Sequence, residues 1–329
     1  MLKEEILNLL KENNDSFISG QFISEKLGVT RTAIWKYINT LKNEGYKIES
    51  VSKKGYRLIS SPDILTYEEI KENLNTKYIG RNIIYYDSID STNTKAKELA
   101  SKGELNGTVI ISEEQTSGRG RLGKIWCSPK NKGIWLSIIL KPEIDPMNVA
   151  KITQIAGASV CKSLLEIGIN SYIKWPNDIV INNKKVCGIL TEMSCELNMI
   201  NYVILGIGIN ANIDKNEIPE EISTIATSLK IEDGKSIKRK YLTAKILNNF
   251  EMLYEEFLHK NSFNTSLEIC KKHSILLGKD IKIINRNTTI IGKAIDIDHD
   301  GRLVIEHLDG KKEALVSGEV SIRGLYGYV

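Results

Sequence analysis

The chain has 329 residues, of which 41% are hydrophobic and 26% are charged, a balance typical of folded globular proteins and not of disordered chains. No stretch reaches the roughly 18 uninterrupted apolar residues of a membrane span, and the early acidic residues Glu4 and Glu5 argue against a secretory signal. The five cysteines form no C-x-x-C pair, and the four histidines, all from His259 onward, have no metal-ligand spacing. We therefore expect a protein of the reducing cytoplasm with no membrane contact, no disulfide scaffold and no histidine metal centre.

The N-terminal segment is basic: between Thr30 and Arg57 seven basic residues stand against two acidic ones. Apolar spacing predicts three helices, the third capped by Thr30 and ended at Gly45, followed by a hairpin with a basic tip. This order is typical of a winged helix, whose third helix enters the major groove while the wing touches the backbone. The predicted DNA-binding residues are Thr30, Arg31, Thr32, Trp35, Lys36, Asn39, Lys53 and Lys54. A small helical module that binds another protein is the alternative.

A linker at Ser60–Asp63 leads to a segment in which strand and helix patterns alternate. Strands are predicted at Thr108–Ser112, Ile134–Leu140, Tyr172–Trp175, Ile179–Ile181, Lys185–Glu192 and Tyr202–Ile209, and long helices at Val149–Ile167 and Lys238–His259. The turns at 176–178 and 182–184 indicate antiparallel neighbours. We expect a mixed or antiparallel sheet with helices on one side, an α+β arrangement more than a doubly wound one.

The last fifty residues are rich in short β patterns separated by Asn-Arg-Asn and Asp-Gly turns. Strands are predicted at Ile281–Ile284, Thr289–Ile297, Leu303–Glu306 and Glu313–Val316, which indicates a small β-barrel-like module. The predicted domains are therefore residues 1–62, 63–275 and 276–329.

A glycine-rich loop follows the strand that ends at Ser112. Its glycines at 118, 120 and 123 satisfy the dinucleotide-binding pattern G-x-G-x-x-G, but that pattern requires a helix to follow. Here the chain continues through Pro129 and Gly133, which excludes a helix, and the loop carries the cations Arg119, Arg121 and Lys124. Cations between glycines predict a loop that binds phosphate, and a solvated basic loop is the alternative.

Three further elements carry polar or glycine residues at the ends of predicted strands. Residues 174–178 (Lys-Trp-Pro-Asn-Asp) form a turn, and the next turn should bring Lys185 back near Asp178. Ser91, Thr92 and Asn93 begin a helix and could merely cap it. Residues 206–210 (Gly-Ile-Gly-Ile-Asn) form a glycine-spaced strand on which a ligand could lie flat.

Taken in order along the chain, these elements resemble the biotin–protein ligases, specifically the bifunctional type that also represses biotin synthesis. The resemblance rests on Gly118-Arg119-Gly120-Arg121-x-Gly123-x-x-Trp126, Lys174-Trp175-Pro176-Asn177-Asp178, Lys185-x-x-Gly188-Ile189-Leu190 and Gly206-x-Gly208-x-Asn210. It implies an α+β multidomain fold with an N-terminal winged helix-turn-helix. The central mixed sheet would be like that of the class II aminoacyl-tRNA synthetases, and the C-terminal domain a small SH3-like β-barrel.

The resemblance also implies an activity: ATP, with Mg²⁺, converts biotin to biotinyl-5′-AMP, and the biotin passes to a lysine of a carboxylase carrier domain. Arg121 and Lys185 would be the catalytic residues. The implied biotin-binding residues are Ser91, Thr92, Asn93, Gln115, Arg119, Gly120, Arg121 and Lys185. The implied ATP- or adenylate-binding residues are Arg119, Arg121, Trp126, Lys174, Asn177, Asp178 and Asn210. The ligands of the metal are not assigned.

In the repressor type, the adenylate-bound protein forms a homodimer that binds operator DNA. We further expect the glycine-rich loop to be ordered by the adenylate, and note that Leu122 stands where some relatives carry another arginine. The alternatives are a lipoate–protein ligase, a ligand-sensing transcription factor with an inactive enzyme domain and, more remotely, a nicotinamide-dependent dehydrogenase.

Overall fold

A computed structural model describes residues 2–197, 199–260, 262–285, 288–316, 321–325 and 327–329. The chain divides into two compact units, Met1–Ile64 and Leu65–Val329, and each is described by itself. In the described residues no helix combines the length and the apolar character needed to cross a membrane.

The first unit is a three-helix domain with a hairpin. Its elements are α1 (Leu2–Glu12), α2 (Gly20–Leu27), α3 (Arg31–Asn43), β1 (Lys47–Val51) and β2 (Gly55–Ser60), with β1 and β2 antiparallel. Gly28 ends α2 with a left-handed φ of 64°, and the Thr30 hydroxyl caps α3 by accepting from the Ala33 amide. Ile23, Ile34 and Ile38 are buried where the helices meet. The predicted winged helix is confirmed.

The wing is tied to the segment before α2. Ile18 pairs with Tyr56 through two backbone hydrogen bonds of 2.9 Å. Gly55 has a φ of 110°, and a Cβ there would lie 2.0 Å from the Ile18 carbonyl oxygen. Glycine therefore allows the hairpin to turn this close to the helical part.

The second unit is built on a seven-stranded sheet with the order β3-β4-β5-β9-β8-β7-β6. Its strands are β3 (Ile83–Tyr86), β4 (Val109–Ser112), β5 (Ile134–Leu140), β6 (Tyr172–Lys174), β7 (Asp178–Ile181), β8 (Lys184–Glu196) and β9 (Met199–Ile209). β3 and β4 are parallel, and the other neighbours are antiparallel. The mixed sheet was predicted, but β3 was not.

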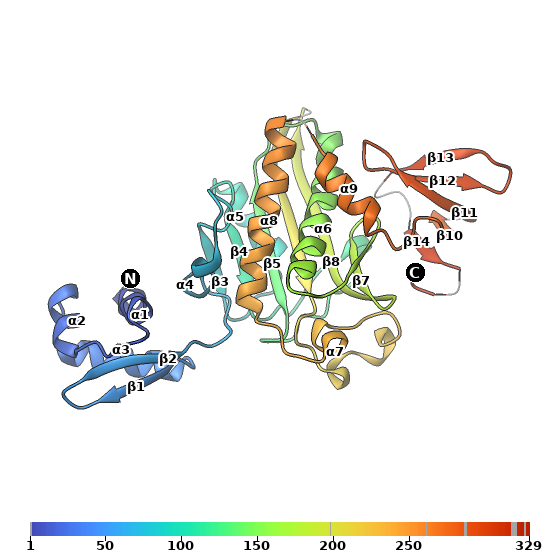
Figure 1. Ribbon diagram of the computed structural model, residues 1–329. Coiled ribbons are helices and arrows are strands. Elements are labelled where there is room, and N and C mark those ends of the chain that lie inside the picture. The colour runs from blue at the N-terminus through green and yellow to red at the C-terminus, as the bar shows by residue number, and fades with distance from the viewer. Residues whose placement is uncertain (1, 198, 261, 286–287, 317–320, 326) are drawn as a thin grey trace. The chain divides into compact units, whose positions relative to one another are not determined.

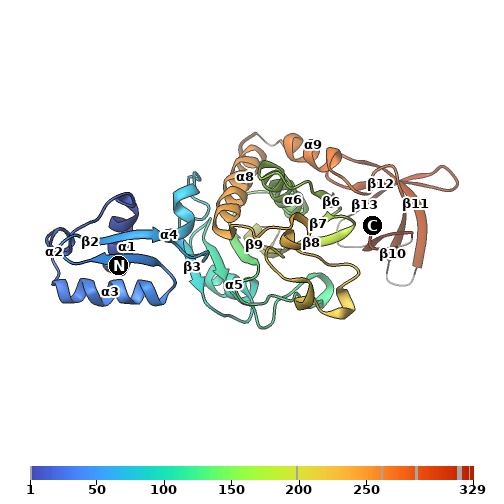
Figure 2. The same cartoon turned by 60° about the horizontal axis from the view of Figure 1, so that its bottom comes forward.

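The helices lie on both faces of this sheet, so the prediction of helices on one side was wrong. α6 (Val149–Glu166) and α8 (Arg239–Lys260) pack on one face, together with α9 (Asn264–Lys272) against α6. α5 (Thr92–Ser101) packs on the other face, where Ala96 and Ala100 contact Ile110, Ile139 and Ile204. The two layers are seen edge-on in Figure 2. Because adjacent residues of a strand point to opposite faces of the sheet, the apolar side chains of one strand pack against the helices on both faces.

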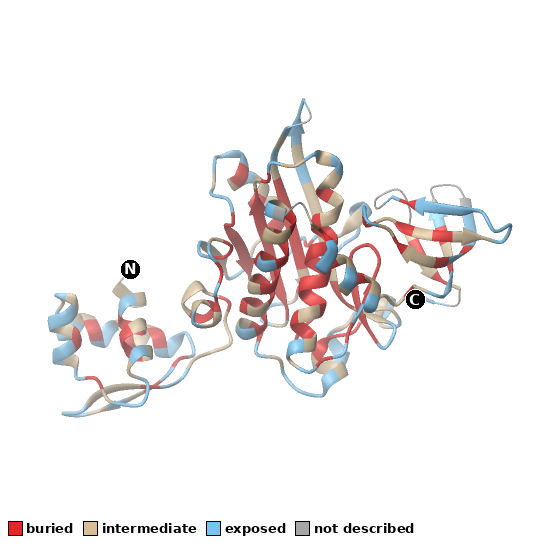
Figure 3. Cartoon of the chain, turned by 45° about the horizontal axis from the view of Figure 1, so that its top comes forward, coloured by how far each residue is buried: buried red, intermediate tan, exposed pale blue. Residues whose placement is uncertain are grey.

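Burial follows this arrangement, because the strands and the inner sides of the helices are the buried part of the unit in Figure 3. The short helices α4 (Tyr67–Ile70) and α7 (Leu229–Asp233) lie in the connections before β3 and after β9. Short 3₁₀ segments occur at Lys71–Asn73, Arg121–Gly123, Pro146–Asn148, Lys215–Glu217 and Glu220–Ile222.

The C-terminal module is a five-stranded antiparallel sheet with the order β13-β12-β11-β10-β14. Its strands are β10 (Asp280–Asn285), β11 (Thr288–Ile297), β12 (Leu303–His307), β13 (Lys312–Leu315) and β14 (Ser321–Gly324). The predicted small β module is thus confirmed, with β14 as a fifth strand that was not predicted. The Gly301 carbonyl accepts hydrogen bonds from Trp175 Nε1 at 2.9 Å and Gln154 Nε2 at 2.6 Å, which fixes the module to the sheet and to α6.

Candidate functional site

One pocket in the second unit brings together all the residues predicted for a ligand site. Its lining includes Ser91, Thr92, Asn93, Gln115, Arg119, Gly120, Arg121, Trp126, Lys174, Asn177, Asp178, Lys185 and Asn210. These residues come from the start of α5, the glycine-rich loop, the β6–β7 turn and strands β8 and β9. The pocket therefore lies where the ends of several elements meet, a common position for ligand sites.

The glycine-rich loop folds into a small hairpin and does not open a helix, apart from a single 3₁₀ turn at Arg121–Gly123. The Gly120 amide donates to the Lys124 carbonyl at 2.7 Å, and the Trp126 amide donates to the Gly118 carbonyl at 2.9 Å. Without a helix N-terminus, the groups that this loop offers to an anion are cationic side chains and loop amides. This geometry excludes the dinucleotide-binding turn.

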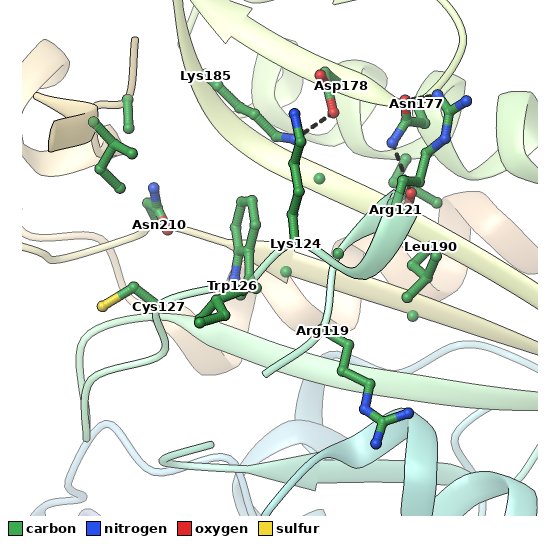
Figure 4. A pocket seen from close by; sticks show the side chains of 18 of the residues that line it. Arg119, Arg121, Lys124, Trp126, Cys127, Asn177, Asp178, Lys185, Leu190 and Asn210 are labelled. Carbon is green, nitrogen blue, oxygen red and sulfur yellow. Dashed lines mark hydrogen bonds and ion pairs between the residues drawn. The ribbon is translucent and has the colours of Figure 1, made fainter. Parts of the chain in front are cut away.

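The two arginines of the loop point in opposite directions, as Figure 4 shows. Arg121 extends over the pocket and its Nη1 donates to Asn177 Oδ1 at 2.9 Å. Arg119 is exposed and extends away from Lys185 and Asp178. Of the two arginines, Arg121 is thus the one that stands among the other cations of the pocket, and Lys124 of the same loop lines the pocket as well.

Lys185 forms an ion pair with Asp178, whose Oδ1 lies 2.6 Å from Nζ, as the predicted turn between them requires. The register between β7 and β8 shifts at this point, so that Val186 is an extra residue, which is a β-bulge. The Lys185 backbone also bonds to the Ile225 carbonyl and the Thr227 amide. Burial alone would raise the pKa of Asp178, but the Lys185 cation holds this pKa below its ordinary value.

Lys174 is buried at the end of β6, beside the same carboxylate. Burial lowers the pKa of Lys174 to about 7; Asp178 opposes this shift, and nearby cations such as Arg323 and Lys185 add to it. The ammonium group is thus close to losing its proton at neutral pH, and an anionic ligand would restore its charge.

Amide and hydroxyl groups also line the pocket. Gln115 Oε1 accepts from the Thr92 amide at 2.9 Å, and Asn93 Nδ2 donates to Glu192 Oε2 at 2.8 Å. The Ser137 hydroxyl lies 2.8 Å from Thr92 Oγ1 and 2.6 Å from Asn93 Oδ1. Ser137 and Glu192 were not predicted, because Ser137 is a single polar residue in an apolar strand and Glu192 is one of several polar residues of β8 that form no motif.

Ser91 caps a helix, as the alternative prediction proposed, and it also lines the pocket. It is the N-cap of α5, and its hydroxyl accepts from the Thr94 amide at 3.5 Å. Its side chain is nevertheless at the pocket wall beside Thr92. Helix capping and pocket lining are therefore compatible at this position.

Glycines of the sheet make room for side chains of the pocket. A Cβ at Gly206 would lie 2.2 Å from Asn93 Oδ1, and a Cβ at Gly208 would lie 2.6 Å from Trp126 Nε1. We expected a ligand to lie flat on this strand, but Asn93 and Trp126 occupy those places. Asn210, at the end of β9, donates through Nδ2 to the Thr227 carbonyl at 3.0 Å.

Two further parts of the pocket have no signal in the local sequence. One is the segment 217–226 between β9 and α7, and the other is formed by Ser321, Ile322, Arg323 and Tyr328 of the C-terminal module. Both reach the pocket only through the fold, so no motif near them could have predicted this.

The predicted DNA-binding residues lie on the outer side of α3 and at the wing tip. Thr30, Arg31, Thr32, Trp35, Lys36, Lys53 and Lys54 are exposed, and Asn39 is half-buried. Trp35, at 60% exposure, is an unusually exposed aromatic residue, and it is in the same helix as the exposed basic residues Arg31 and Lys36. This surface has the polarity and charge of a nucleic-acid interface.

Comparison with known protein families finds matches to three parts of the chain. Residues 85–210 match the biotin/lipoate A/B protein ligase family, residues 3–57 match an HTH domain, and residues 276–323 match the biotin protein ligase C-terminal domain.

The relatives extend over nearly the whole sequence. The bifunctional ligase/repressor BirA of Bacillus subtilis is 40% identical over 313 residues, which cover 95% of this chain and 96% of that protein. BirA of Escherichia coli is 30% identical over 94% of each chain. Among solved structures, the biotin protein ligase from Aquifex aeolicus in complex with biotin and ATP has a TM-score of 0.66 at 33% identity, covering 74% of this chain and 99% of that one. The chain belongs to the family of bifunctional biotin protein ligase/repressors.

Proposed function

We propose that the pocket joins biotin to protein in two steps, as part of a chain that is both a biotin ligase and a repressor. In the first step a biotin carboxylate oxygen attacks the α-phosphorus of ATP, and the bond from this phosphorus to pyrophosphate breaks. In the second step a lysine amine of a carboxylase carrier domain attacks the acyl carbon of biotinyl-5′-AMP, and AMP leaves. The nucleophiles are substrate groups, so the enzyme needs no covalent intermediate.

The observation that carries the proposal is that one pocket combines cationic side chains with amide and hydroxyl groups. Arg121 and Lys185 supply the cations, and Thr92, Asn93 and Gln115 supply the amides and the hydroxyl. Negative charge develops on phosphoryl oxygens during adenylation, and fixed cations stabilise it. The buried ureido group of biotin needs hydrogen-bond partners, since unsatisfied polar groups are costly.

We assign roles to the pocket residues on this basis. Arg121 and Lys185 stabilise the charge on the α-phosphate. Biotin is held by Ser91, Thr92, Asn93, Gln115, Arg119, Gly120, Arg121 and Lys185. The nucleotide is held by Arg119, Arg121, Trp126, Lys174, Asn177, Asp178 and Asn210. Because Arg119 now points away, its contact requires the loop to fold further over the ligand, and we propose that the adenylate orders the loop in this way.

Mg²⁺ enters the site as part of the substrate, bound to ATP. Within the part of the chain that the structure describes, no group of three or more His, Cys, Asp or Glu side chains is placed to hold a metal. Asp178 and Glu217 are carboxylates of the pocket lining. Mg²⁺ commonly keeps several waters and takes one or two carboxylates together with substrate phosphates, which fits a pocket of this composition.

The domain roles follow from the same proposal. Residues 1–62 bind operator DNA, residues 63–275 form the catalytic domain, and residues 276–329 form the C-terminal β domain. The adenylate-bound chain forms a homodimer, and two winged helices then bind one operator. All five cysteines are free thiols, in keeping with a cytoplasmic protein.

The test is incubation of the full chain with biotin, ATP, Mg²⁺ and a carboxylase carrier domain, followed by an avidin blot. The wild type should label the carrier domain, and lipoic acid in place of biotin should not. Arg121→Gly should make biotinyl-5′-AMP more slowly and release it, because the cation that stabilises the α-phosphate and retains the intermediate is absent, so free intermediate should be found in the filtrate. A wild type that labels nothing, or that transfers lipoic acid instead, would contradict the proposal.

A further inference from the structure

Of the four residues with which the C-terminal module lines the pocket, one carries a positive charge and one an aromatic ring. Arg323 is on β14, and Tyr328 lies just beyond it, at the end of the chain. Both line the pocket, although Tyr328 is 150 residues away from Asp178 in the sequence. A module otherwise remote from the ligand site thus supplies part of its wall.

Tyr328 contacts two charged residues of the pocket at once. Its hydroxyl donates a hydrogen bond to Asp178 Oδ2. The face of its ring lies 3.4 Å from Lys174 Nζ, measured to the ring centroid, and 5.0 Å from the guanidinium carbon of Arg323. Lys174 is buried, so its ammonium has little water around it, and a ring face is a favourable neighbour for such a cation.

These contacts connect Tyr328 to the proposed catalytic lysine. Asp178 is shared between two partners, since Oδ2 accepts from Tyr328 while Oδ1 pairs with Lys185 at 2.6 Å. A carboxylate held on both oxygens has one fixed orientation, which in turn fixes the Lys185 ammonium. The cations Lys174, Lys185 and Arg323 exceed the one carboxylate among them, which suits a polyanionic ligand such as a triphosphate.

We propose that Tyr328 is a positioning residue for ATP: it holds Asp178 and Lys174 in the arrangement that receives the triphosphate. The inference rests on the proposed function of the pocket and adds the C-terminal segment to its nucleotide site. Tyr328 acts through these two neighbours and takes no part in the bonds that form and break. Its loss should therefore weaken ATP binding and leave biotin binding unchanged.

The experiment measures KM for ATP and KM for biotin separately, on the full chain, for Tyr328→Leu and Tyr328→Phe. Tyr328→Leu removes both the ring face and the hydroxyl, and should raise KM for ATP about tenfold with KM for biotin within about twofold. Tyr328→Phe keeps the ring face and should recover most of this loss. Calorimetric titration with a non-hydrolysable ATP analogue should show the same order of affinities without requiring turnover.

A matched control separates positioning from attachment of the module. Lys151→Ala removes the ion pair between Lys151 and Asp300, 3.2 Å in length, which attaches the same module away from the pocket, and should leave KM for ATP unchanged. The proposal is wrong if Tyr328→Leu leaves the affinity for the analogue unchanged, if both KM values rise together, or if Lys151→Ala has the same effect. Failure of the wild type to biotinylate, with the analogue affinities still in the expected order, would instead overturn the proposed function alone.

Discussion

Lys185 is held in place from both its backbone and its side chain, which suits its proposed role of stabilising developing charge. The bulge in β8 and the bonds to residues 225–227 fix its backbone, and Asp178 fixes its ammonium. We expect Lys185→Met to lower the rate of adenylate formation by about 10²–10³-fold, the usual effect of removing one fixed charge-stabilising group. ATP–pyrophosphate exchange measures this step without the carrier domain.

The neighbouring lysine provides the control for this prediction. Lys184 is on the same strand, but its ammonium donates to the Ser223 carbonyl at 3.0 Å and it does not line the pocket. Lys184→Met should keep the exchange rate within about twofold, as is usual for substitutions that do not touch the reacting groups. Equal losses of exchange rate in the two variants would show that the rate depends on the strand segment as a whole and not on the Lys185 ammonium.

The buried Lys174 leads to a prediction about how the free energy of unfolding depends on pH. Its pKa is about 7 in the folded chain, because burial opposes the charge, and 10.5 is its ordinary value. Below pH 7 Lys174 is protonated in both the folded and the unfolded chain, so the desolvation free energy of the buried ammonium destabilises the folded state in full. Between pH 7 and 10.5 the unfolded state binds more protons, and the stability contribution of Lys174 rises by up to about 1.4 kcal/mol per pH unit.

Lys174→Met should therefore raise the free energy of unfolding most at pH 6, and this advantage should shrink above pH 7. Urea unfolding from pH 6 to pH 9 measures the difference, with the exposed Lys215→Met as a control whose effect should not vary with pH. A constant difference for Lys174→Met over this range would mean that Lys174 is not a buried cation with a lowered pKa.

At the level of elements, glycines in β9 and β8 set how closely α5 and the loop approach the sheet. Gly206→Ala would place a Cβ 2.2 Å from Asn93 Oδ1 and displace the amide from Ser137 and Glu192. Overpacking of this kind costs about 1–3 kcal/mol, and we also expect a raised KM for biotin. Chemical denaturation and steady-state kinetics measure the two effects.

α6 offers a control for the glycine prediction. A Cβ at Gly157 would meet Ile189 Cδ1 at 3.8 Å, an ordinary contact, within the helix. Gly157→Ala should therefore stabilise the chain by about 0.5–1 kcal/mol without changing either KM. If Gly206→Ala behaved like Gly157→Ala, the close approach of Asn93 to the sheet would not matter for biotin.

Most elements could be predicted because their signals are local. The apolar run at Ile134–Leu140 is β5 as observed, and Thr30 caps α3 as its residue type indicates. β3 and β14 have four residues each, no fewer than the predicted β4 and β7, and they are defined by their pairing with β4 and β10, which lie elsewhere in the sequence. The position of α5 on the second face depends on such non-local packing as well.

The same distinction explains which site residues could be found. The glycine-rich loop and the 174–178 turn concentrate unusual residues in short segments, so their chemistry is visible in the sequence. Ser137, Glu192 and Tyr328 are single residues in ordinary surroundings, and only their neighbours in space give them a role. A pocket assembled from strand ends necessarily contains residues of both kinds.

For the molecule as a whole, the proposed function gives ligase and repressor one shared intermediate. On this proposal the adenylate would be consumed when an acceptor lysine is available and would accumulate otherwise, so its level would shift the population of DNA-binding dimers. A ligand shifts such an equilibrium only as far as it binds the two states differently. Retention of the adenylate by Arg121 should therefore matter for DNA binding, although Arg121 is in the catalytic unit.

We expect the affinity for operator DNA and the dimer fraction to rise together when biotin and ATP are added. Fluorescence anisotropy with operator DNA and sedimentation velocity measure the two quantities. Arg121→Gly should lose the ligand-dependent rise but keep the basal affinity. Lys36→Ala, on the exposed side of α3, should weaken binding at every ligand level and reduce the salt slope by about 1 per DNA-bound copy, with biotinylation unchanged. Equal operator affinity with and without biotin and ATP would rule out the adenylate as co-repressor, while the ligase reaction would stand on its own assay.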